Sequence, residues 1–572
     1  MIHKGYSFVA VAKAQFTLVN NKIGLHSLST RAKLIYTFAI LVFVSLMATV
    51  IWLLNGKFKT GIDDANIYFV YMRNLSKGYG LVYNVGGERV EGFTSLLWTL
   101  IGATFYVFTD NPEFLFVLLN IALITYTLCN LVFYFSSHLN AKRPNRYVIL
   151  FLGLLAVVPG YFEWTVLSLL ETGLWSSILI LSVLNILSYN TENFNRSNIS
   201  LSVLIFLLLL CRPESILWGL FFSIVRMTQS FLFFKKPSKI NFLPIVTFLI
   251  VISAVIGFRL MYFGYPVPNT FYAKVSSDYI ENIKNGIKYL YLYFIDSPVV
   301  ILIISAIAYT LYTFFRNGKI NFQLLFIALV ILLTFSIPLY TGGDHFGYSR
   351  FIQPLVPIIY LALVLILLDQ DIQPNLYIIV TFLLFLVFTS ENSLVKYYKP
   401  ERKLLWNEWE IARMGQEKSE KLNSFFDALP RLPSQGVFTA GGTAYKYNGV
   451  TIDLLGLNNV KMAHAETQKD NSLKNHAAFN KEIFMEQKPD LFWYAGEFVS
   501  TAGLDANEAI VTSPWLRKVF KQIQDDEKFN KEYCPVLIFK KNETLALKIF
   551  ASYSFLNSLD DRYFQYSKIP VK

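Results

Sequence analysis

The sequence has few charged residues, few cysteines and no tract of low complexity. Charged side chains make up 16% of its 572 residues, whereas hydrophobic side chains make up 54%. Apolar runs of spanning length in so weakly charged a chain exclude an ordinary soluble protein and predict several membrane crossings. The apolar content ends near residue 390, and the composition of the remaining chain is typical of a soluble domain.

Three further absences narrow the possible functions. The three cysteines, Cys129, Cys211 and Cys534, have neither the spacing of a zinc site nor the density of a disulfide framework. The chain also lacks the Gly-rich phosphate loop of nucleotide-binding enzymes. Its net charge of +12 lies largely in short loops between apolar runs, where the positive-inside rule explains it. We therefore expect no nucleic-acid partner, no metal and no other cofactor.

Eleven apolar runs predict membrane-spanning helices. They are residues 34–54, 113–136, 147–163, 171–189, 199–211, 214–233, 242–262, 298–315, 322–340, 351–368 and 376–390. The basic segment before the first run predicts a cytoplasmic amino terminus and places loop 55–111 outside. Segment 94–108 is apolar but short, and we expect a juxtamembrane helix there. The alternative, a short true span, would put the basic residues Lys142 and Arg143 outside.

The expected architecture is thus an all-α membrane domain over residues 1–390, followed by an extracytoplasmic soluble α/β domain over residues 391–572. In the second domain, residues 401–429 have the apolar spacing of an amphipathic helix. Four short apolar runs bounded by Gly, Pro or charge predict strands at 436–440, 450–454, 491–494 and 536–539. Helical stretches between these strands favour an α/β domain.

Residues 61–98 hold the densest set of polar groups beside an apolar run. The stretch opens with Asp63 and Asp64 and continues through a Gly-rich turn to Glu88, Arg89 and Glu91. Charges held against a bilayer are costly, which makes such residues functional candidates. The alternative is that one of the two aspartates only caps a helix that starts at Ala65 and ends at Gly78.

Further polar clusters occur at other span ends that the predicted topology places outside. They are Glu163–Trp164, Glu171–Thr172, Arg212–Glu214, residues 266–274 and residues 342–350. A transporter is expected to keep such groups near the bilayer midplane. Polar groups gathered at one surface instead favour chemistry between a lipid-borne and a water-borne substrate. A transporter or flippase of lipid-linked sugars and an inactive envelope scaffold stay open as alternatives.

The order of residues in this stretch resembles a known family. The stretch is similar to the first extracytoplasmic loop of GT-C membrane glycosyltransferases. The residues that carry this similarity are D-D-A, then R-N-L-x-x-G-x-G-L-V-Y-N, then G-E-R-V-E-G-x-T-x-x-L-W. The closest resemblance is to the terminal arabinofuranosyltransferases of cell-wall arabinan synthesis, although Val85 replaces a frequent proline. Glu171–Thr172, Asp453–Leu457 and Ala463–His464 also resemble elements of that family.

The resemblance implies an inverting glycosyltransferase in the cytoplasmic membrane. Its donor would be a polyprenyl-phosphate sugar, with arabinofuranose the best single expectation for the sugar. Its acceptor would be a cell-envelope glycan or glycolipid on the outer side. The resemblance assigns the general base to Asp63 first and to Asp64 second. Adjacent residues of a helix point in directions about 100° apart around its axis, so the two carboxylates cannot both contact the same substrate atom equally well.

The departing phosphate needs positive charge, for which Arg212, Lys274 and Arg350 are the candidates. Binding of ordinary lipid head groups, or pairing of Arg212 with Glu214, are the alternatives. Other candidates for contact with the sugar or the acceptor are Arg73, Glu91, Trp98, Glu171, Glu214, Asn269, Asp344 and His345. His345 beside Asp344 also suits a proton carrier, but two residues do not make a metal site. Trp98, Tyr161, Trp164 and Tyr348 either stack on a sugar or belong to an interfacial aromatic belt.

Overall fold

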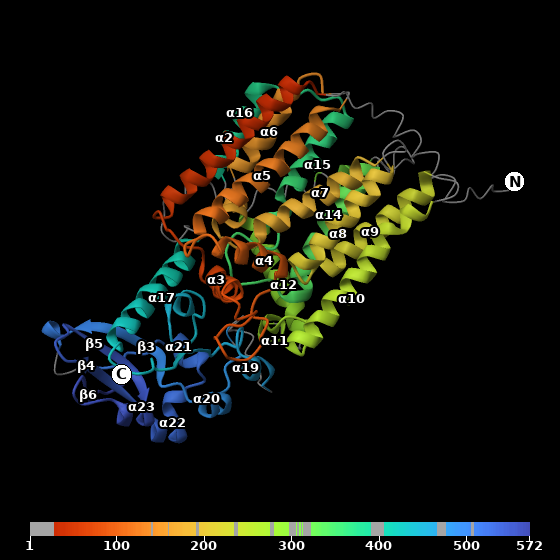
Figure 1. Cartoon of the computed structure of the whole chain (residues 1–572). Coiled ribbons are helices and arrows are strands. Elements are labelled where there is room, and N and C mark those ends of the chain that lie inside the picture. The colour runs from red at the N-terminus through yellow and green to blue at the C-terminus, as the bar shows by residue number, and fades with distance from the viewer. Residues whose placement is uncertain are drawn as a thin grey trace.

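A bundle of helices and a smaller sheet-containing domain at one of its ends form the protein (Figure 1). The computed structural model describes residues 28–138, 141–157, 160–189, 194–233, 238–274, 279–296, 305, 308–309, 312, 322–389, 405–465, 476, 478–504 and 508–571. The predicted span 298–315, apart from the four residues 305, 308, 309 and 312, and the predicted domain boundary at residue 391 lie outside the described residues.

Eleven helices of the described residues, most of them apolar, make up the bundle. They are α2 (Thr30–Leu54), α5 (Glu113–Ser136), α6 (Pro144–Val157), α7 (Thr172–Leu187), α8 (Phe194–Cys211), α9 (Ser215–Phe233), α10 (Leu243–Phe263), α12 (Tyr279–Asp296), α14 (Phe322–Thr341), α15 (Val356–Asp369) and α16 (Leu376–Thr389). Within the described residues, five are long and apolar enough to cross a membrane, namely α2, α5, α8, α14 and α10 with the short turn before it. The chain is therefore a membrane protein.

Eleven spans are not confirmed. The predicted spans at 147–163, 171–189, 214–233, 351–368 and 376–390 correspond to α6, α7, α9, α15 and α16, which have 14 to 19 residues. These helices do not reach the combination of length and apolar content that marks the five spans. A helix of 14 residues rises only about 21 Å, which is less than the hydrocarbon thickness of about 30 Å.

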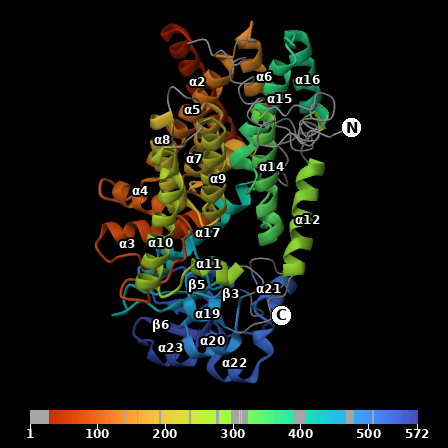
Figure 2. The same ribbon diagram turned by 90° about the vertical axis from the view of Figure 1, so that its right-hand side faces the viewer.

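Two shorter helices lie across the end of the bundle that faces the sheet domain (Figures 1 and 2). They are α3 (Asp63–Ser76) and α4 (Leu96–Tyr106), which pack against each other. Gly78, two residues after α3, has a φ of 82°, a conformation that glycine adopts without strain. The 11 residues of α4 rise about 16 Å, too short a distance for this helix to cross a bilayer alone.

The second domain is built on one six-stranded sheet with the order β2-β1-β3-β5-β4-β6. Its strands are β1 (Gln435–Val437), β2 (Thr451–Asp453), β3 (Leu491–Ser500), β4 (Tyr533–Lys540), β5 (Leu545–Ser552) and β6 (Phe564–Lys568). Strand β1 is parallel to β2 and β3, whereas β3, β5, β4 and β6 pair antiparallel. The four predicted strands are confirmed, and β5 and β6 were not predicted.

Successive strand residues point to opposite sides of the sheet. Both faces of the sheet pack against helices. On one face, α17 (Trp406–Phe425) contributes Trp409 and Leu422 to a core that also contains Val536 and Ile538. The other face packs on α20 (Lys481–Gln487), α21 (Pro514–Val519) and α22 (Glu527–Glu532). The helix α23 (Tyr553–Ser558) follows β5.

Hydrogen bonds join the sheet domain to loop 55–111. Asn84 exchanges two of them with the backbone of Thr451, at 2.9 and 3.0 Å. Arg73 donates to the carbonyl oxygen of Tyr445, in α18 (Gly442–Lys446), at 2.6 Å. Gln416 of α17 donates to Asn66 of α3 at 2.7 Å. These contacts fix the sheet domain against the helix that begins with the two aspartates.

Candidate active site

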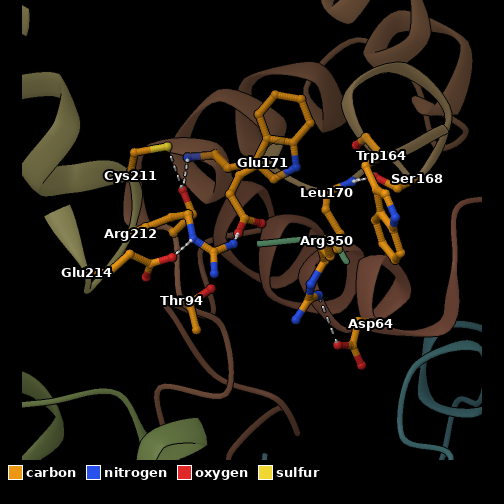
Figure 3. A network of polar contacts seen from close by, with 12 residues as sticks. Asp64, Thr94, Trp164, Ser168, Leu170, Glu171, Cys211, Arg212, Glu214 and Arg350 are labelled. Atoms are coloured by element: carbon orange, nitrogen blue, oxygen red, sulfur yellow. Dashed lines mark hydrogen bonds and ion pairs between the residues drawn. The ribbon is translucent and has the colours of Figure 1, made fainter. Parts of the chain in front are cut away.

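A cavity of about 570 Å³ lies at the end of the bundle nearest the sheet domain. Its wall is mostly apolar and holds seven charged side chains: Asp64, Glu171, Arg212, Glu214, Lys274, Asp344 and Arg350. They come from the start of α3, the start of α7, the turn between α8 and α9, the end of α11 (Asn269–Lys274) and the segment after α14. Helix ends thus bring together residues that are far apart in the sequence (Figure 3).

The helical phase of α3 separates the two aspartates. Asp64, Ile67 and Tyr68 line the cavity, as expected for positions i, i+3 and i+4 on one helix face. Asp63 is not among the lining residues and is turned toward the sheet domain. The capping alternative is wrong, because α3 begins at Asp63 and its N-cap residue, Ile62, makes no side-chain cap.

Asp64 lies between two cations on the cavity wall. Its Oδ2 atom is 3.5 Å from Nζ of Lys274 and 4.0 Å from Nη1 of Arg350. Burial acts to raise the pKa of Asp64, but Lys274, Arg350 and His345 outweigh it and lower the pKa below its usual value. With its side chain 25% exposed, Asp64 is an ionised carboxylate that a ligand in the cavity can reach.

Asp63 has a different environment. Its two oxygens accept hydrogen bonds from the backbone N–H groups of Gly441 at 3.1 Å and Gly442 at 2.8 Å. Burial raises the pKa of Asp63 to about 6, the Gly442 bond opposes this, and the charge of Asp64 adds to it. Asp63 therefore ties the start of α3 to the start of α18, and both of its oxygens already accept hydrogen bonds.

Arg350 is held by a carboxylate and by aromatic rings. Its Nε atom donates to Oδ2 of Asp344 at 2.9 Å, and its guanidinium carbon lies 4.4 Å from the ring centre of Phe346. Two consecutive residues before it, Tyr348 and Ser349, have φ values of 52° and 51°. Non-glycine residues rarely adopt this left-handed conformation, and it often accompanies functional sites.

Arg212 is bracketed by two glutamates, as Figure 3 shows. Its Nη1 atom pairs with Oε1 of Glu171, and its Nε atom donates to Oε1 of Glu214 at 2.6 Å. Glu171 occupies the N-cap position of α7, next to the positive end of the helix dipole. Leu169, two residues before Glu171, has a φ of 60°, so that the chain turns sharply from the π-helix Glu163–Leu167 into α7.

Five predicted contact residues lie outside the cavity lining. Trp98 is fully buried and donates to the carbonyl oxygen of Leu169 at 3.2 Å. Glu91 forms a buried, two-pronged ion pair with Arg259 of α10, with distances of 2.9 to 3.1 Å. Arg73, Asn269 and His345 contact the sheet domain instead, through Tyr445, Gly456 and His476 respectively. Each of these side chains contacts another part of the protein instead of the cavity, and these contacts could not be predicted from the sequence.

Two residues near the site were not found from the sequence. Tyr68 lines the cavity, and its hydroxyl lies 2.8 Å from Oγ1 of Thr94; its spacing of four from Asp64 was the available signal. Glu408 of α17 lies close enough to Asp64 and Asp63 that burial and their charges raise its pKa to about 8. No sequence signal connects α17 to α3, because this proximity depends on the packing of the two domains.

Similarity to known proteins is weak. No protein-family model and no characterised sequence matches the chain. A similar solved structure is the oligosaccharyltransferase of Archaeoglobus fulgidus in its apo form, with 10% identity, a TM-score of 0.46, and coverage of 89% of this chain and 74% of that one. Another is oligosaccharyltransferase AglB from Archaeoglobus fulgidus, in complex with an inhibitory peptide and a dolichol-phosphate, with 10% identity, a TM-score of 0.45, and coverage of 92% and 75%. At these scores the likeness carries no inference about this chain, whose chemistry follows from its own residues.

Proposed function

We propose that the protein is an inverting membrane glycosyltransferase of GT-C type. It transfers a sugar from a polyprenyl-phosphate donor to a glycan or glycolipid of the cell envelope, on the outer side of the cytoplasmic membrane. Arabinofuranose is the first sugar to test. The observation that carries the proposal is an ionised carboxylate, Asp64, within 4.0 Å of both Lys274 and Arg350 on the wall of a mostly apolar cavity.

Asp64 is proposed as the general base. It accepts the proton of the acceptor hydroxyl as that oxygen bonds to the anomeric carbon, and the carbon–phosphate oxygen bond breaks on the opposite face. Asp64 is preferred to Asp63 because it lines the cavity, whereas both oxygens of Asp63 accept backbone hydrogen bonds. This preference reverses the order that the resemblance implied.

Lys274 and Arg350 are proposed to bind the departing phosphate. Arg350 supplies a planar fork and Lys274 a compact charge, and both suit phosphate oxygens. A bound phosphate draws these cations away from Asp64, so that they lower the pKa of Asp64 by less. The donor therefore makes Asp64 a stronger base than it is in the empty site.

Lipid access supports a donor with an isoprenoid chain. The cavity wall includes Leu217 of α9, Phe271 of α11 and Tyr340 of α14, whose side chains are 41% to 55% exposed. Helix α14 is one of the five apolar helices of spanning length. Exposed apolar side chains at the mouth of a cavity, beside such a helix, suit a chain that enters from the bilayer rather than from water.

The rival proposal is a flippase of lipid-linked sugars, and one experiment separates the two. The purified protein is incubated with decaprenyl-phosphoryl arabinofuranose, a panel of related donors and an envelope glycan extract. A transferase releases free decaprenyl phosphate and forms a glycoside of inverted anomeric configuration. A flippase instead moves the intact donor across vesicle membranes without phosphate release, and this outcome would overturn the proposal.

A further inference from the structure

The charges on the cavity wall are not evenly balanced. At one end, Lys274 pairs with Asp64 and Arg350 with Asp344, so that two cations face two carboxylates. At the other end, Arg212 is paired with both Glu171 and Glu214. Two carboxylates and one guanidinium leave one formal negative charge at this second end. All three side chains are at most 15% exposed, so water screens that charge weakly.

Glu171 also has an unused acceptor. Its residue is only 1% exposed, and its Oε2 atom has no hydrogen-bond partner within the described part of the chain. Folded proteins leave few buried polar atoms unpaired, because an unpaired acceptor costs free energy. Glu171 lines the cavity, and a turn of its carboxylate would let a ligand hydroxyl donate to this buried oxygen.

Arg212 is poorly placed to bind phosphate. Its Nε and Nη1 atoms already donate to Glu214 and Glu171, so two sides of the guanidinium are occupied (Figure 3). A phosphate at the remaining nitrogen would stand close to both carboxylates and would be repelled by them. The guanidinium therefore acts as a counterion that orients the two glutamates.

From these observations we infer that Glu171, Arg212 and Glu214 form the sugar subsite of the donor and select an uncharged sugar. A sugar hydroxyl donates to Oε2 of Glu171, and the excess negative charge excludes sugars that carry a carboxylate. The inference rests on the proposed function for its identification of the cavity as a donor site. It assigns the phosphate to Lys274 and Arg350 alone, and it removes uronic acids from the candidate donors.

Binding of three probes to the purified full-length protein tests this subsite. The probes are decaprenyl phosphate, decaprenyl-phosphoryl glucose and decaprenyl-phosphoryl glucuronate. The last two differ only at C6, which is an uncharged hydroxymethyl group in glucose and a carboxylate in glucuronate. The wild type is expected to bind the glucuronate lipid about tenfold more weakly than the glucose lipid, which corresponds to about 1.4 kcal/mol. Glu171→Gln and Glu214→Gln should each reduce this ratio to about threefold or less, because each removes the excess charge.

Controls separate the sugar subsite from the phosphate site. Glu171→Gln should not weaken binding of decaprenyl phosphate, whereas Lys274→Gln should weaken binding of all three lipids. Glu417→Gln, on the exposed surface of α17, should alter none of them. Glu214→Gln provides a second test if Glu171→Gln does not fold, because the Glu214 side chain is the more exposed of the two.

Two outcomes would overturn the inference. Equal binding of the two sugar lipids by the wild type would mean that the site does not select by charge. A Glu171→Gln variant that loses affinity for decaprenyl phosphate as strongly as for the sugar lipids would put this cluster in the phosphate site. The proposed function fails separately, if the lipids bind with the expected ratios but no sugar is ever transferred.

Discussion

Two opposing effects set the proton affinity of Asp64. Burial raises its pKa, while the cations Lys274 and Arg350, together with His345, lower it by more. A general base must be ionised to act, so activity is lost as the pH falls through the pKa of Asp64. The neighbouring cations therefore keep the base active to lower pH than an isolated buried carboxylate would allow.

The first prediction concerns this pH dependence. Replacing Lys274 by glutamine removes a cation 3.5 Å from the carboxylate and should raise the pKa of Asp64. The acidic limb of the kcat/KM profile should then move to higher pH, beyond any uniform loss of rate from weaker donor binding. The profile of Lys284→Gln, whose side chain is 68% exposed on α12, is the control and should match the wild type. An unshifted limb in the Lys274 variant would mean that Asp64 is not the titrating base.

At the scale of elements, the turn before α18 is fitted closely to α3. A Cβ atom added at Gly441 would lie 1.8 Å from the backbone oxygen of Asp63, nearer than any real contact allows. The turn and the helix start would have to separate, which would break the hydrogen bonds between Asp63 and the glycines.

The second prediction is therefore that Gly441→Ala destabilises the protein, by about 1–3 kcal/mol, as overpacking commonly does. It should also reduce transfer, because Asp64 directly follows the displaced residue. Thermal unfolding in detergent and transfer assays measure the two effects. Gly257→Ala in α10 is a matched control, since its added methyl meets no atom within 4 Å. Equal unfolding temperatures for the two variants would contradict a close fit at Gly441.

The ion pair between Glu91 and Arg259 links loop 55–111 to α10. Both residues are at most 7% exposed, and their contacts are two-pronged. Removing one partner of a buried pair leaves the other charge without compensation, which costs about 3–5 kcal/mol. Removing both partners costs less, since no unpaired charge remains.

The third prediction follows from this asymmetry. Glu91→Gln should lower the unfolding temperature more than the double variant Glu91→Gln, Arg259→Met. Unfolding in detergent, followed for both single variants and the double variant, gives the coupling between the two residues. Additive losses would show that the pair does not stabilise the loop as a unit.

Element boundaries and pairings were only partly predictable from the sequence. The four apolar runs in the sheet domain correspond to β1–β4, since short runs bounded by Gly, Pro or charge are typical of strands. Strand β5 was missed because a buried lysine, Lys548, interrupts its apolar run; Glu497 and Glu508 neutralise that charge at 2.6 and 3.1 Å. Strand β6 lies at the sheet edge and is mostly exposed, so that it carries no apolar pattern.

The roles of the two aspartates could not be derived from the sequence either. Their adjacency on a helix indicated that only one can face a given ligand, and α3 has that geometry. Which one faces the cavity depends on Gly441 and Gly442, almost 400 residues later in the chain. Likewise, the sequence shows polar clusters at the ends of the apolar runs, but it does not show that Arg212 pairs with Glu171. That pairing depends on the packing of α7 against α8.

At the scale of the whole molecule, the two ends of the helix bundle differ: one end contacts the sheet domain, and the other carries basic residues in and beside the loop between α5 and α6. Helix α3, whose Asp64 lines the cavity, lies with the sheet domain at one end of the bundle (Figures 1 and 2). In the loop that joins α5 and α6, Lys142 pairs with Asp371 at 2.9 Å. In the first turn of α6, Arg146 donates to the carbonyl oxygen of Pro374 at 3.0 Å. Loops with basic residues are typical of the cytoplasmic side, which would place the site outside.

The fourth prediction tests this orientation. A cysteine at Asn557, exposed on α23 of the sheet domain, should react with a membrane-impermeant thiol reagent in intact cells. A cysteine at the exposed Lys142 should react only after the membrane is permeabilised. Background labelling should be low because the three native cysteines are buried. Labelling of both positions in intact cells would contradict an orientation with the two ends on opposite sides.

The most direct test of the proposed chemistry is single-turnover transfer by the two aspartate variants. Asp64→Asn and Asp63→Asn are compared with the wild type, using a polyprenyl-phosphate sugar that the wild type accepts, and donor affinity is measured separately. Loss of the base at Asp64 should slow transfer by about 10²–10⁴-fold, while donor binding is largely kept. Asp63→Asn should retain more activity and lower the unfolding temperature instead, because it alters the contact with Gly441 and Gly442. Wild-type transfer by Asp64→Asn would contradict the assignment of Asp64 as the base and, with it, the proposed active site.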